Sequence, residues 1–363
     1  MALKSCAVIA VVLFGATGSS ACLDAACADT LLPTRIYQIT EPLIDDQGRI
    51  ATNISGLACM TTAAVRSLCL VIDDQGRFAQ AATLESGRIA AGARLPLVGS
   101  KASRDTVGRP PAQPGCSGGA GKYKDIDGEA VAYASPFFYV VGSHGCSRHS
   151  EKFRSSSFIL ARIPEAGVAG ALSSPPLIFD PSSVKTTYRL SEALAAAPGV
   201  RPYFTRDLLG ANGLNIEGLV VSGGKLFAGL RAPTLDAKAF IVAIDVDRLF
   251  DPAATIGESD ARVISVPLGP DRGIRDLALL KDGRLLVLSG PAQDAQLPFE
   301  IHILDIVHET TALLGTLSES IGSPDGKAEA ISVLSQHDNV VDVLVMFDGL
   351  PSGGPREYRL SLK

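Results

Sequence analysis

Tryptophan is absent from the 363-residue chain, and no run of apolar residues reaches the length of about 20 that a membrane helix needs. The first absence argues against WD40 repeats, whose signature includes a tryptophan. The second argues against a membrane span. The chain also lacks a G-x-S-x-G nucleophile elbow, a P-loop and a dinucleotide-binding fingerprint. No motif of high specificity therefore identifies a reaction, and the oligomeric state is equally undetermined.

Charge of one sign is also scarce, because 33 Lys and Arg residues face 38 Asp and Glu residues, for a net charge of −5. A mildly acidic surface of mixed sign argues against nucleic acid and anionic membranes as partners. A content of 46% hydrophobic residues is ample for a large core and argues against disorder.

The amino terminus has the pattern of an export signal. Lys4 precedes a short apolar stretch from Ala7 to Ala16, and Ala26-Cys27-Ala28 offers small residues for cleavage. We predict a signal peptide over residues 1–28, with cleavage between Ala21 and Ala28, and a secreted or periplasmic mature chain. Lipoprotein anchoring at Cys22 is the less favoured alternative, because the preceding residues lack the large aliphatic side chain that such sites carry.

Four of the seven cysteines lie beyond this segment, namely Cys59, Cys69, Cys116 and Cys146. In an exported chain they predict two disulfides, for which three connectivities exist. We favour Cys59 with Cys69 across one hairpin, and Cys116 with Cys146 between a loop and a strand end. Zinc is disfavoured, since it needs closely paired cysteines or histidine partners.

An internal repeat is the most informative feature of the sequence. Five segments share a turn, then a polar or small residue, then an alternating apolar strand: 53–57, 127–131, 215–219, 273–277 and 327–331. Further β-rich runs separated by Gly, Asp and Pro follow each segment. The pattern predicts an all-β fold, a single β-propeller over residues 29–363. We expect five blades, with six as the alternative, and a ring closed by pairing of Arg35–Ile39 with the carboxy-terminal strand.

Two stretches interrupt this rhythm. Residues 87–122 are rich in Gly, Pro, Ser and Arg and are interpreted as a long exposed loop. Residues 166–212 are interpreted as an insertion with one short helix, capped by Ser191 and ended by Pro198-Gly199. A degenerate sixth blade would have to lie in one of these two stretches.

The sequence resembles the bacterial family catalogued as domain of unknown function 3616. The resemblance rests on 127–130, 142–144, 216–219, 229–233, 273–277 and 289–291, and it extends over most of the mature chain. It implies an exported, propeller-like protein and brings no established activity. A looser similarity to esterase-like phytase propellers lies in the Glu-Gly and Glu-Ala starts of the strands.

Polar residues of the repeat are the candidates for a functional site. In a propeller the innermost strands line the axis, so their starts should converge at one end of the central channel. We name Glu129, Glu217, His144, Arg231 and Arg275 as catalytic candidates, Asp127, Asp276, Ser143 and Glu329 as ligand-binding candidates, and Glu129, Glu217 and Glu329 as metal-binding candidates. His144 and Arg231 are aligned with each other, because they follow Gly142 and Gly229 at the ends of the second strands. A purely structural role stands beside this, in which carboxylates hold neighbouring blades together through pairs such as Glu217 with Arg231 or Glu129 with Arg275.

Two functions fit these residues. The favoured hypothesis is a non-catalytic module that binds a small molecule, a glycan or a partner protein. The alternative is a hydrolase of phosphate or carboxylic esters assisted by a metal, for which calcium suits a set of carboxylates best. The run Asp125–Glu129 resembles the start of an EF-hand, but Pro136 would occupy the twelfth position and cannot close such a loop. A Ser143–His144 dyad is disfavoured, because adjacent residues on a strand point to opposite faces.

Overall fold

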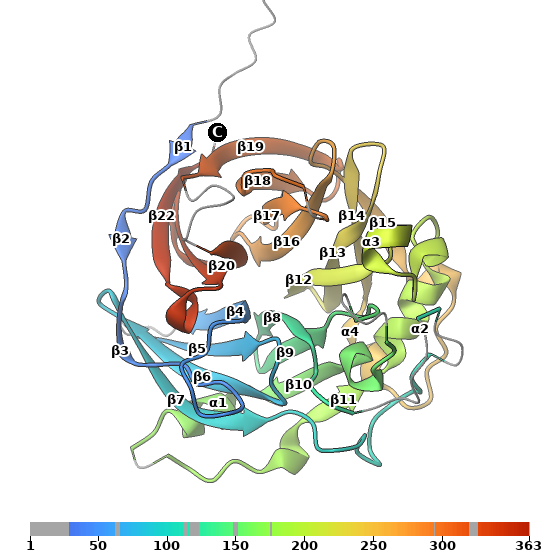
Figure 1. Ribbon diagram of the computed structural model, residues 1–363, viewed down its shortest axis with the longest axis horizontal. Coiled ribbons are helices and arrows are strands. Elements are labelled where there is room, and N and C mark those ends of the chain that lie inside the picture. The colour runs from blue at the N-terminus through green and yellow to red at the C-terminus, as the bar shows by residue number, and fades with distance from the viewer. Residues whose placement is uncertain are drawn as a thin grey trace, which may run out of the picture.

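The computed structural model describes residues 29–61, 66–111, 115–116, 123–147, 152–174, 176–293, 295–318 and 326–362. Within this part of the chain the strands form five sheets, which surround one axis like the blades of a propeller (Figure 1). The prediction of a five-bladed, all-β propeller is confirmed. No sixth sheet is present among the described residues.

Each blade is an antiparallel sheet built from consecutive hairpins. From the axis outward, blade I contains β4 (Ile54–Thr61), β5 (Arg66–Asp73), β6 (Phe78–Glu85) and β7 (Arg88–Pro96), and blade II contains β8 (Gly128–Ala134), β9 (Phe137–Gly142), β10 (Leu160–Pro164) and β11 (Lys185–Thr187). Blade III contains β12 (Asn215–Ser222), β13 (Lys225–Leu235), β14 (Lys238–Asp245) and β15 (Arg262–Pro267). Blade IV contains β16 (Arg272–Leu279), β17 (Leu285–Pro291), β18 (Glu300–Asp305) and β19 (Thr310–Leu317), and blade V contains β20 (Lys327–His337), β21 (Val340–Asp348) and β22 (Arg356–Ser361). All five repeat segments begin or lead into an innermost strand, as predicted.

An amino-terminal arm closes the ring from the outside. β1 (Thr30–Leu31) pairs in parallel with β19, β2 (Arg35–Ile36) pairs antiparallel with β22, and β3 (Gln38–Glu41) pairs in parallel with β7. The arm therefore runs along the outer edges of blades IV, V and I, and β2 is the fourth strand of blade V (Figure 1). The predicted pairing of Arg35–Ile39 with the carboxy-terminal strand is confirmed for Arg35–Ile36, whereas Gln38 and Ile39 pair with β7. The arm also covers edges that would otherwise expose unpaired backbone groups.

The two interruptions of the repeat differ in part from the prediction. The predicted loop 87–122 is wrong at its start, because β7 occupies Arg88–Pro96. Small residues conceal the strand in the sequence, while Ile89 and Leu95 supply its buried face. Residues 166–212 hold more than the single helix expected: α1 (Glu165–Ala171), α2 (Arg189–Ala196) and α3 (Leu208–Ala211) are all present. α2 begins before Ser191, which lies inside its first turn and not at the cap.

The remaining helices are short. α4 (Val246–Phe250) follows β14, and single 3₁₀ turns occupy Ser155–Phe158, Pro181–Ser183, Arg201–Tyr203, Glu258–Asp260 and Pro351–Gly353. The helices α2 and α4 lie outside the sheets, beside blades II and III (Figure 1). None of the helices in the described ranges is long and apolar enough to cross a membrane.

The hydrophobic core is divided into five clusters, one at each junction between neighbouring blades. Innermost strands approach closely at these junctions, and glycine is required at some of them. A Cβ at Gly56 would lie 2.8 Å from the Cα of Ala130 on the next blade, so a side chain there would push two blades apart. Apolar side chains are buried mainly between neighbouring blades, and this burial is the main contribution to the stability of the fold.

Both predicted disulfides are confirmed. Cys59–Cys69 joins β4 to β5 across a directly opposed pair, and Cys116–Cys146 joins the loop before β8 to the chain after β9. Two such bonds are typical of a protein from an oxidising compartment. The predicted signal peptide, including Cys22, lies outside the described residues.

Candidate functional site

Every innermost strand carries a β-bulge at the same place. Pairing with the second strand jumps by two residues, from Ile54 to Gly56 in blade I and from Gly128 to Ala130 in blade II, and the same jump recurs in blades III, IV and V. The extra residues, here called the axial ring, are Ser55, Glu129, Glu217, Arg275 and Glu329. They are the five residues that the repeat aligns. A bulge redirects a side chain out of the alternation of the strand, and here it does so once per blade.

A second set of equivalent residues follows the second strands. Ile54 pairs with Asp73 and Ile216 pairs with Leu230, so Asp74 and Arg231 are structurally equivalent. The full set, here called the strand-end set, is Asp74, Ser143, Arg231, Gly290 and Asp348. The sequence alignment that matched His144 to Arg231 is off by one residue, since Gly128 pairs with Gly142 and Ser143 comes next.

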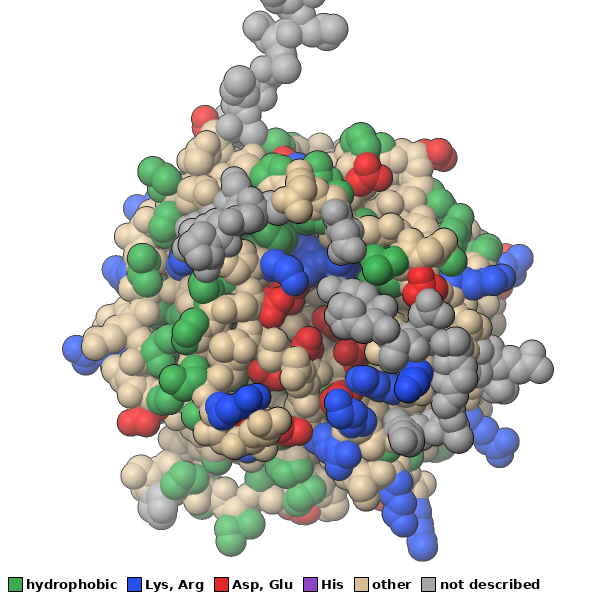
Figure 2. Space-filling model, viewed as in Figure 1, with side chains coloured by type: hydrophobic (Ala, Val, Ile, Leu, Met, Phe, Trp, Pro, Cys, Tyr) green, Lys and Arg blue, Asp and Glu red, His purple; other side chains and the backbone are tan. Residues whose placement is uncertain are grey.

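The two sets meet at a pocket on the axis, here called the acidic pocket. Its volume is about 340 Å³. Figure 2 shows acidic side chains gathered at the centre of this face and basic side chains around them. Seven carboxyl groups line it, those of Asp74, Asp125, Asp127, Glu129, Glu217, Glu329 and Asp348, together with Lys124, Arg154, Asn215 and Ser147. The central prediction, that distant strand starts face a shared centre, is confirmed for Glu129, Glu217 and Glu329.

Arg275 links three blades at the base of this pocket. Its Nη1 lies 2.9 Å from Glu217 Oε2 and its Nη2 contacts Glu329 Oε1. Arg231 approaches Glu217 from the other side, with Nη1 2.8 Å from Oε1. The predicted pair of Glu217 with Arg231 is present, but Arg275 pairs with Glu217 and Glu329 in place of the expected Glu129. Burial alone would lower the pKa of Arg275, and the surrounding carboxylates outweigh it and raise that pKa.

Glu129 is the glutamate of the axial ring that pairs with neither Arg231 nor Arg275. Within the described part of the chain it forms no hydrogen bond or ion pair, although it lines the acidic pocket. Burial, reinforced by the charges of Glu217, Asp127 and Asp74, raises the pKa of Glu129 well above its ordinary value. Glu129 therefore keeps its proton to a higher pH than an exposed glutamate does, and in that form it can donate a hydrogen bond.

Asp74 is in a similar position. Burial raises its pKa to about 9, with further contributions from Asp127 and Asp73. Its Oδ1 atom is inaccessible and has no hydrogen-bond partner among the described residues. The acidic pocket thus contains at least two carboxyl groups that keep their protons at pH values where exposed carboxyl groups are ionised.

The rim of the pocket is held by local contacts. Ser143 donates its hydroxyl hydrogen to Asp127 Oδ2 at 2.5 Å, so Ser143 fixes a carboxylate and is not available as a nucleophile. Arg154 and Lys124 both pair with Asp125, at 3.0 and 3.2 Å. Among the described residues, Lys124 and Arg154 are the basic side chains that line the pocket, and Arg231 and Arg275 pair with its carboxylates without lining it.

Five predicted site residues are not among those that line the pocket. Ser143, Arg231 and Arg275 each contact a lining carboxylate, whereas Asp276 and His144 are hydrogen-bonded to backbone groups. Asp276 is fully buried beneath the axial ring, where it accepts hydrogen bonds from the N–H groups of Leu277 and Ile331, each at 2.8 Å. His144 is also fully buried, at a φ of 52°, and its Nδ1 lies 2.9 Å from the carbonyl oxygen of Gly142. Burial lowers the pKa of His144 to about 4, so it is neutral at physiological pH. Neither side chain reaches the lining of the acidic pocket.

The metal-binding candidates can be compared with the observed geometry. Among the described residues, no group of three or more His, Cys, Asp or Glu side chains is arranged to hold a metal ion. The trio Glu129, Glu217 and Glu329 is spread around the ring, and Arg275 already neutralises two of its members. Calcium, the metal of the alternative hypothesis, gains no support from this arrangement.

The sequence reasoning missed Asp74, Asp348, Asp125 and Asn215 as lining residues. Asp74 and Asp348 belong to the strand-end set, so the ends of the second strands carried a usable signal. That signal required the pairing register, because the turns between first and second strands differ in length from blade to blade.

Comparison with known proteins confirms the resemblance drawn from the sequence. Residues 182–357 match the family described as "Protein of unknown function (DUF3616)". The matched range is narrower than expected, since the motifs at 127–130 and 142–144 lie outside it. No curated protein matches the chain.

The solved structures that match this chain include three whose titles name a galactosidase, an arabinofuranosidase and an arabinanase. A GH43 β-1,3-galactosidase is 10% identical with a TM-score of 0.43, and the match covers 91% of this chain but only 59% of that one. An α-L-arabinofuranosidase from Podospora anserina is 12% identical (TM-score 0.42; 91% and 98% covered). An α-L-arabinanase from Penicillium chrysogenum is 11% identical (TM-score 0.42; 92% and 99% covered). Similarity at this level carries no information on the activity of this chain.

Proposed function

We propose that this chain, which resembles the family described as protein of unknown function (DUF3616) over residues 182–357, is an exported binding protein whose acidic pocket takes a neutral, hydroxyl-rich small molecule such as the end of a glycan. The predicted signal peptide and the two disulfides support export. The pocket supports binding, because its volume of about 340 Å³ lies within the range of about 300–1,000 Å³ usual for small-molecule sites.

Glu129 is the observation that carries the proposal. A bulge directs it to the axis, it lines the pocket, and no described residue satisfies it. Glu129 is half-buried at the pocket wall, so a ligand hydroxyl that displaces water there can become its hydrogen-bond partner.

The mixture of donors and acceptors indicates the ligand class. Protonated Glu129 and Asp74 donate, and the ionised carboxylates around them accept. A hydroxyl group does both at once, so several neighbouring hydroxyls match this lining. Phosphate esters match it poorly, because the ionised carboxylates of the pocket would repel their negative charge.

Isothermal titration calorimetry with a panel of neutral disaccharides tests the proposal, with glucose 6-phosphate and spermidine as the anionic and cationic comparisons. We expect a neutral sugar to bind and glucose 6-phosphate not to bind. Glu129→Ala should weaken sugar binding about tenfold, the value of one good hydrogen bond, whereas Glu129→Gln keeps a donor at this position. Glu85→Ala is the matched control, because Glu85 is exposed at the end of β6 and outside the pocket.

The anionic and cationic comparison ligands decide between ligand classes. Binding of spermidine without binding of any sugar would replace the hydroxyl-rich ligand with a cationic one. Equal effects of Glu129→Ala and Glu85→Ala would remove the acidic pocket from the proposal. Any bound sugar should also be assayed for cleavage, because a carboxyl group with a raised pKa is the usual proton donor in hydrolysis. Turnover that is lost in Glu129→Gln alone would make the pocket an active site.

A further inference from the structure

A second set of equivalent side chains follows the axial ring along the innermost strands. Two residues after each axial-ring position, every innermost strand carries an aliphatic side chain: Leu57, Val131, Leu219, Leu277 and Ile331, here called the apolar plug. Each of the five is 3% exposed or less. Each belongs to a different one of the five hydrophobic clusters between the blades. Along the strands they lie on the side of the ring toward the end of the channel opposite the acidic pocket.

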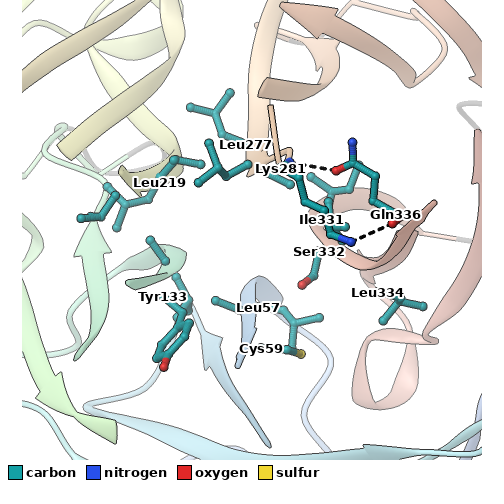
Figure 3. A pocket seen from close by; sticks show the side chains of 18 of the residues that line it. Leu57, Cys59, Tyr133, Leu219, Leu277, Lys281, Ile331, Ser332, Leu334 and Gln336 are labelled. Carbon is teal, nitrogen blue, oxygen red and sulfur yellow. Dashed lines mark hydrogen bonds between the residues drawn. The ribbon is translucent and has the colours of Figure 1, made fainter. Parts of the chain in front are cut away.

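A second cavity, here called the apolar basin, opens at that opposite end. It has a volume of about 510 Å³, and the plug forms its floor. Figure 3 shows Leu57, Leu219, Leu277 and Ile331, which come from four different blades, around one cavity. The basin and the acidic pocket share no lining residue.

The charge of the basin is opposite to that of the acidic pocket. None of its twenty lining residues is an Asp or Glu, whereas Lys281 and His337 both belong to the lining. Lys281 Nζ donates to the carbonyl oxygen of Gln336 at 2.8 Å, and its backbone N–H donates to Gln336 Oε1 at 2.8 Å. An ammonium group has three hydrogens to donate, so two remain for a ligand. The hydroxyl of Ser332 also points into the cavity (Figure 3).

We propose that the apolar basin binds a small amphipathic anion, an unbranched alkyl chain with one carboxylate. The chain would lie against the apolar plug, and the carboxylate would accept hydrogen bonds from Lys281. This site is separate from the proposed glycan site and does not depend on it. A mostly apolar cavity with few polar groups at one side is the usual form of a site for such ligands.

The absence of tryptophan gives a direct test. Leu279 lines the basin and is 37% exposed, so Leu279→Trp places a single fluorophore at the site without disturbing the core. We expect dodecanoate, titrated below its micellar concentration, to shift the emission of this variant to shorter wavelength with saturation. Val307→Trp is the matched control, because Val307 is 74% exposed and lies outside the basin. It should not respond.

The role of Lys281 is tested in the same background. Lys281→Met keeps the aliphatic part of the side chain and should weaken dodecanoate binding about fivefold while leaving dodecanol binding unchanged. Calorimetry on the unsubstituted protein should give the same affinity for dodecanoate as the fluorescence titration, and Glu129→Gln should retain it. No saturable signal, an equal response of Val307→Trp, or equal affinity for dodecyltrimethylammonium would each overturn the proposal.

Discussion

Removal of the Arg275 guanidinium is the sharpest test of the arrangement at the axis. Arg275 is 3% exposed and balances Glu217 and Glu329 from two other blades. In Arg275→Met, Glu217 keeps Arg231, whereas Glu329 keeps only the hydroxyl of Ser55, which lies 3.3 Å from Oε2. The variant therefore leaves one buried carboxylate without a counter-charge.

The cost of this change can be worked out from the pKa of Glu329. The simplest relief is uptake of one proton, which from an ordinary pKa of 4.5 costs at most about 3 kcal/mol at pH 7 and less than about 1 kcal/mol at pH 5, because burial already raises the pKa of Glu329 in the folded protein. The pH 7 value lies at the lower end of the loss of about 3–5 kcal/mol typical when one partner of a buried ion pair is removed. We expect Arg275→Met to lower the free energy of unfolding by up to about 3 kcal/mol at pH 7, and much less at pH 5.

Urea unfolding at both pH values, followed by circular dichroism, measures this difference. The double variant Arg275→Met with Glu329→Gln is the control, because it removes the charge that Arg275 balances and should recover most of the stability at pH 7. A loss that is equal at pH 5 and pH 7, or no recovery in the double variant, would show that Arg275 acts through packing and that the charge argument is wrong.

Three further expectations concern other parts of the molecule. The pKa of Asp74 is raised from 3.8 to about 9, so its contribution to stability is lost as the pH rises through this range, and Asp74→Asn should stabilise the protein at pH 8 by about 1–3 kcal/mol in urea unfolding. His144 has a pKa lowered from 6.5 to about 4, so stability should fall by up to about 3 kcal/mol as the pH drops from 6.5 to 4. His144→Asn, which tolerates the positive φ, should flatten that dependence in thermal melts recorded across this pH range. Deletion of residues 29–36 removes β1 and β2, and with β2 the partner of Arg356–Ser361. Hydrogen exchange should therefore accelerate in Arg356–Ser361 and remain unchanged in blade III. Uniform acceleration would show that the arm stabilises the whole ring.

The blades could be predicted because their first strands are unusually alike. A turn, a polar residue and then alternating apolar residues recur at Glu129, Glu217 and Glu329, and period two leaves little freedom in how such a strand lies. The strand β7 was missed because its residues are mostly small, so no apolar alternation is visible in its sequence. Its buried face packs against α1, which is distant in the sequence, and against the strands beside it.

Of the candidate site, the carboxylates of the axial ring could be predicted from the sequence. The register jump that directs the axial ring toward the channel is a property of strand pairing and has no signature in the residues themselves. For the same reason Asp276, the residue after Arg275, was grouped with the ring although it lies beneath it. His144 was aligned with Arg231 by counting from a glycine, and the pairing of Gly128 with Gly142 shows that Ser143 is the equivalent residue.

Asp276 explains how two cavities of opposite chemistry can share one channel. Its carboxyl group accepts hydrogen bonds from the backbone N–H groups of Leu277 and Ile331. Burial raises the pKa of Asp276 well above its ordinary value, and these two hydrogen bonds, together with one from the backbone of Leu219, lower it in part. Leu219, Leu277 and Ile331 all belong to the apolar plug, and they come from blades III, IV and V. One buried carboxylate thus fixes the backbone at the level where the channel changes from polar to apolar. Because the plug is held by backbone contacts and not by the ring side chains, substitution of Glu129 in the acidic pocket should leave the apolar basin intact, and the two proposed sites can be tested one at a time.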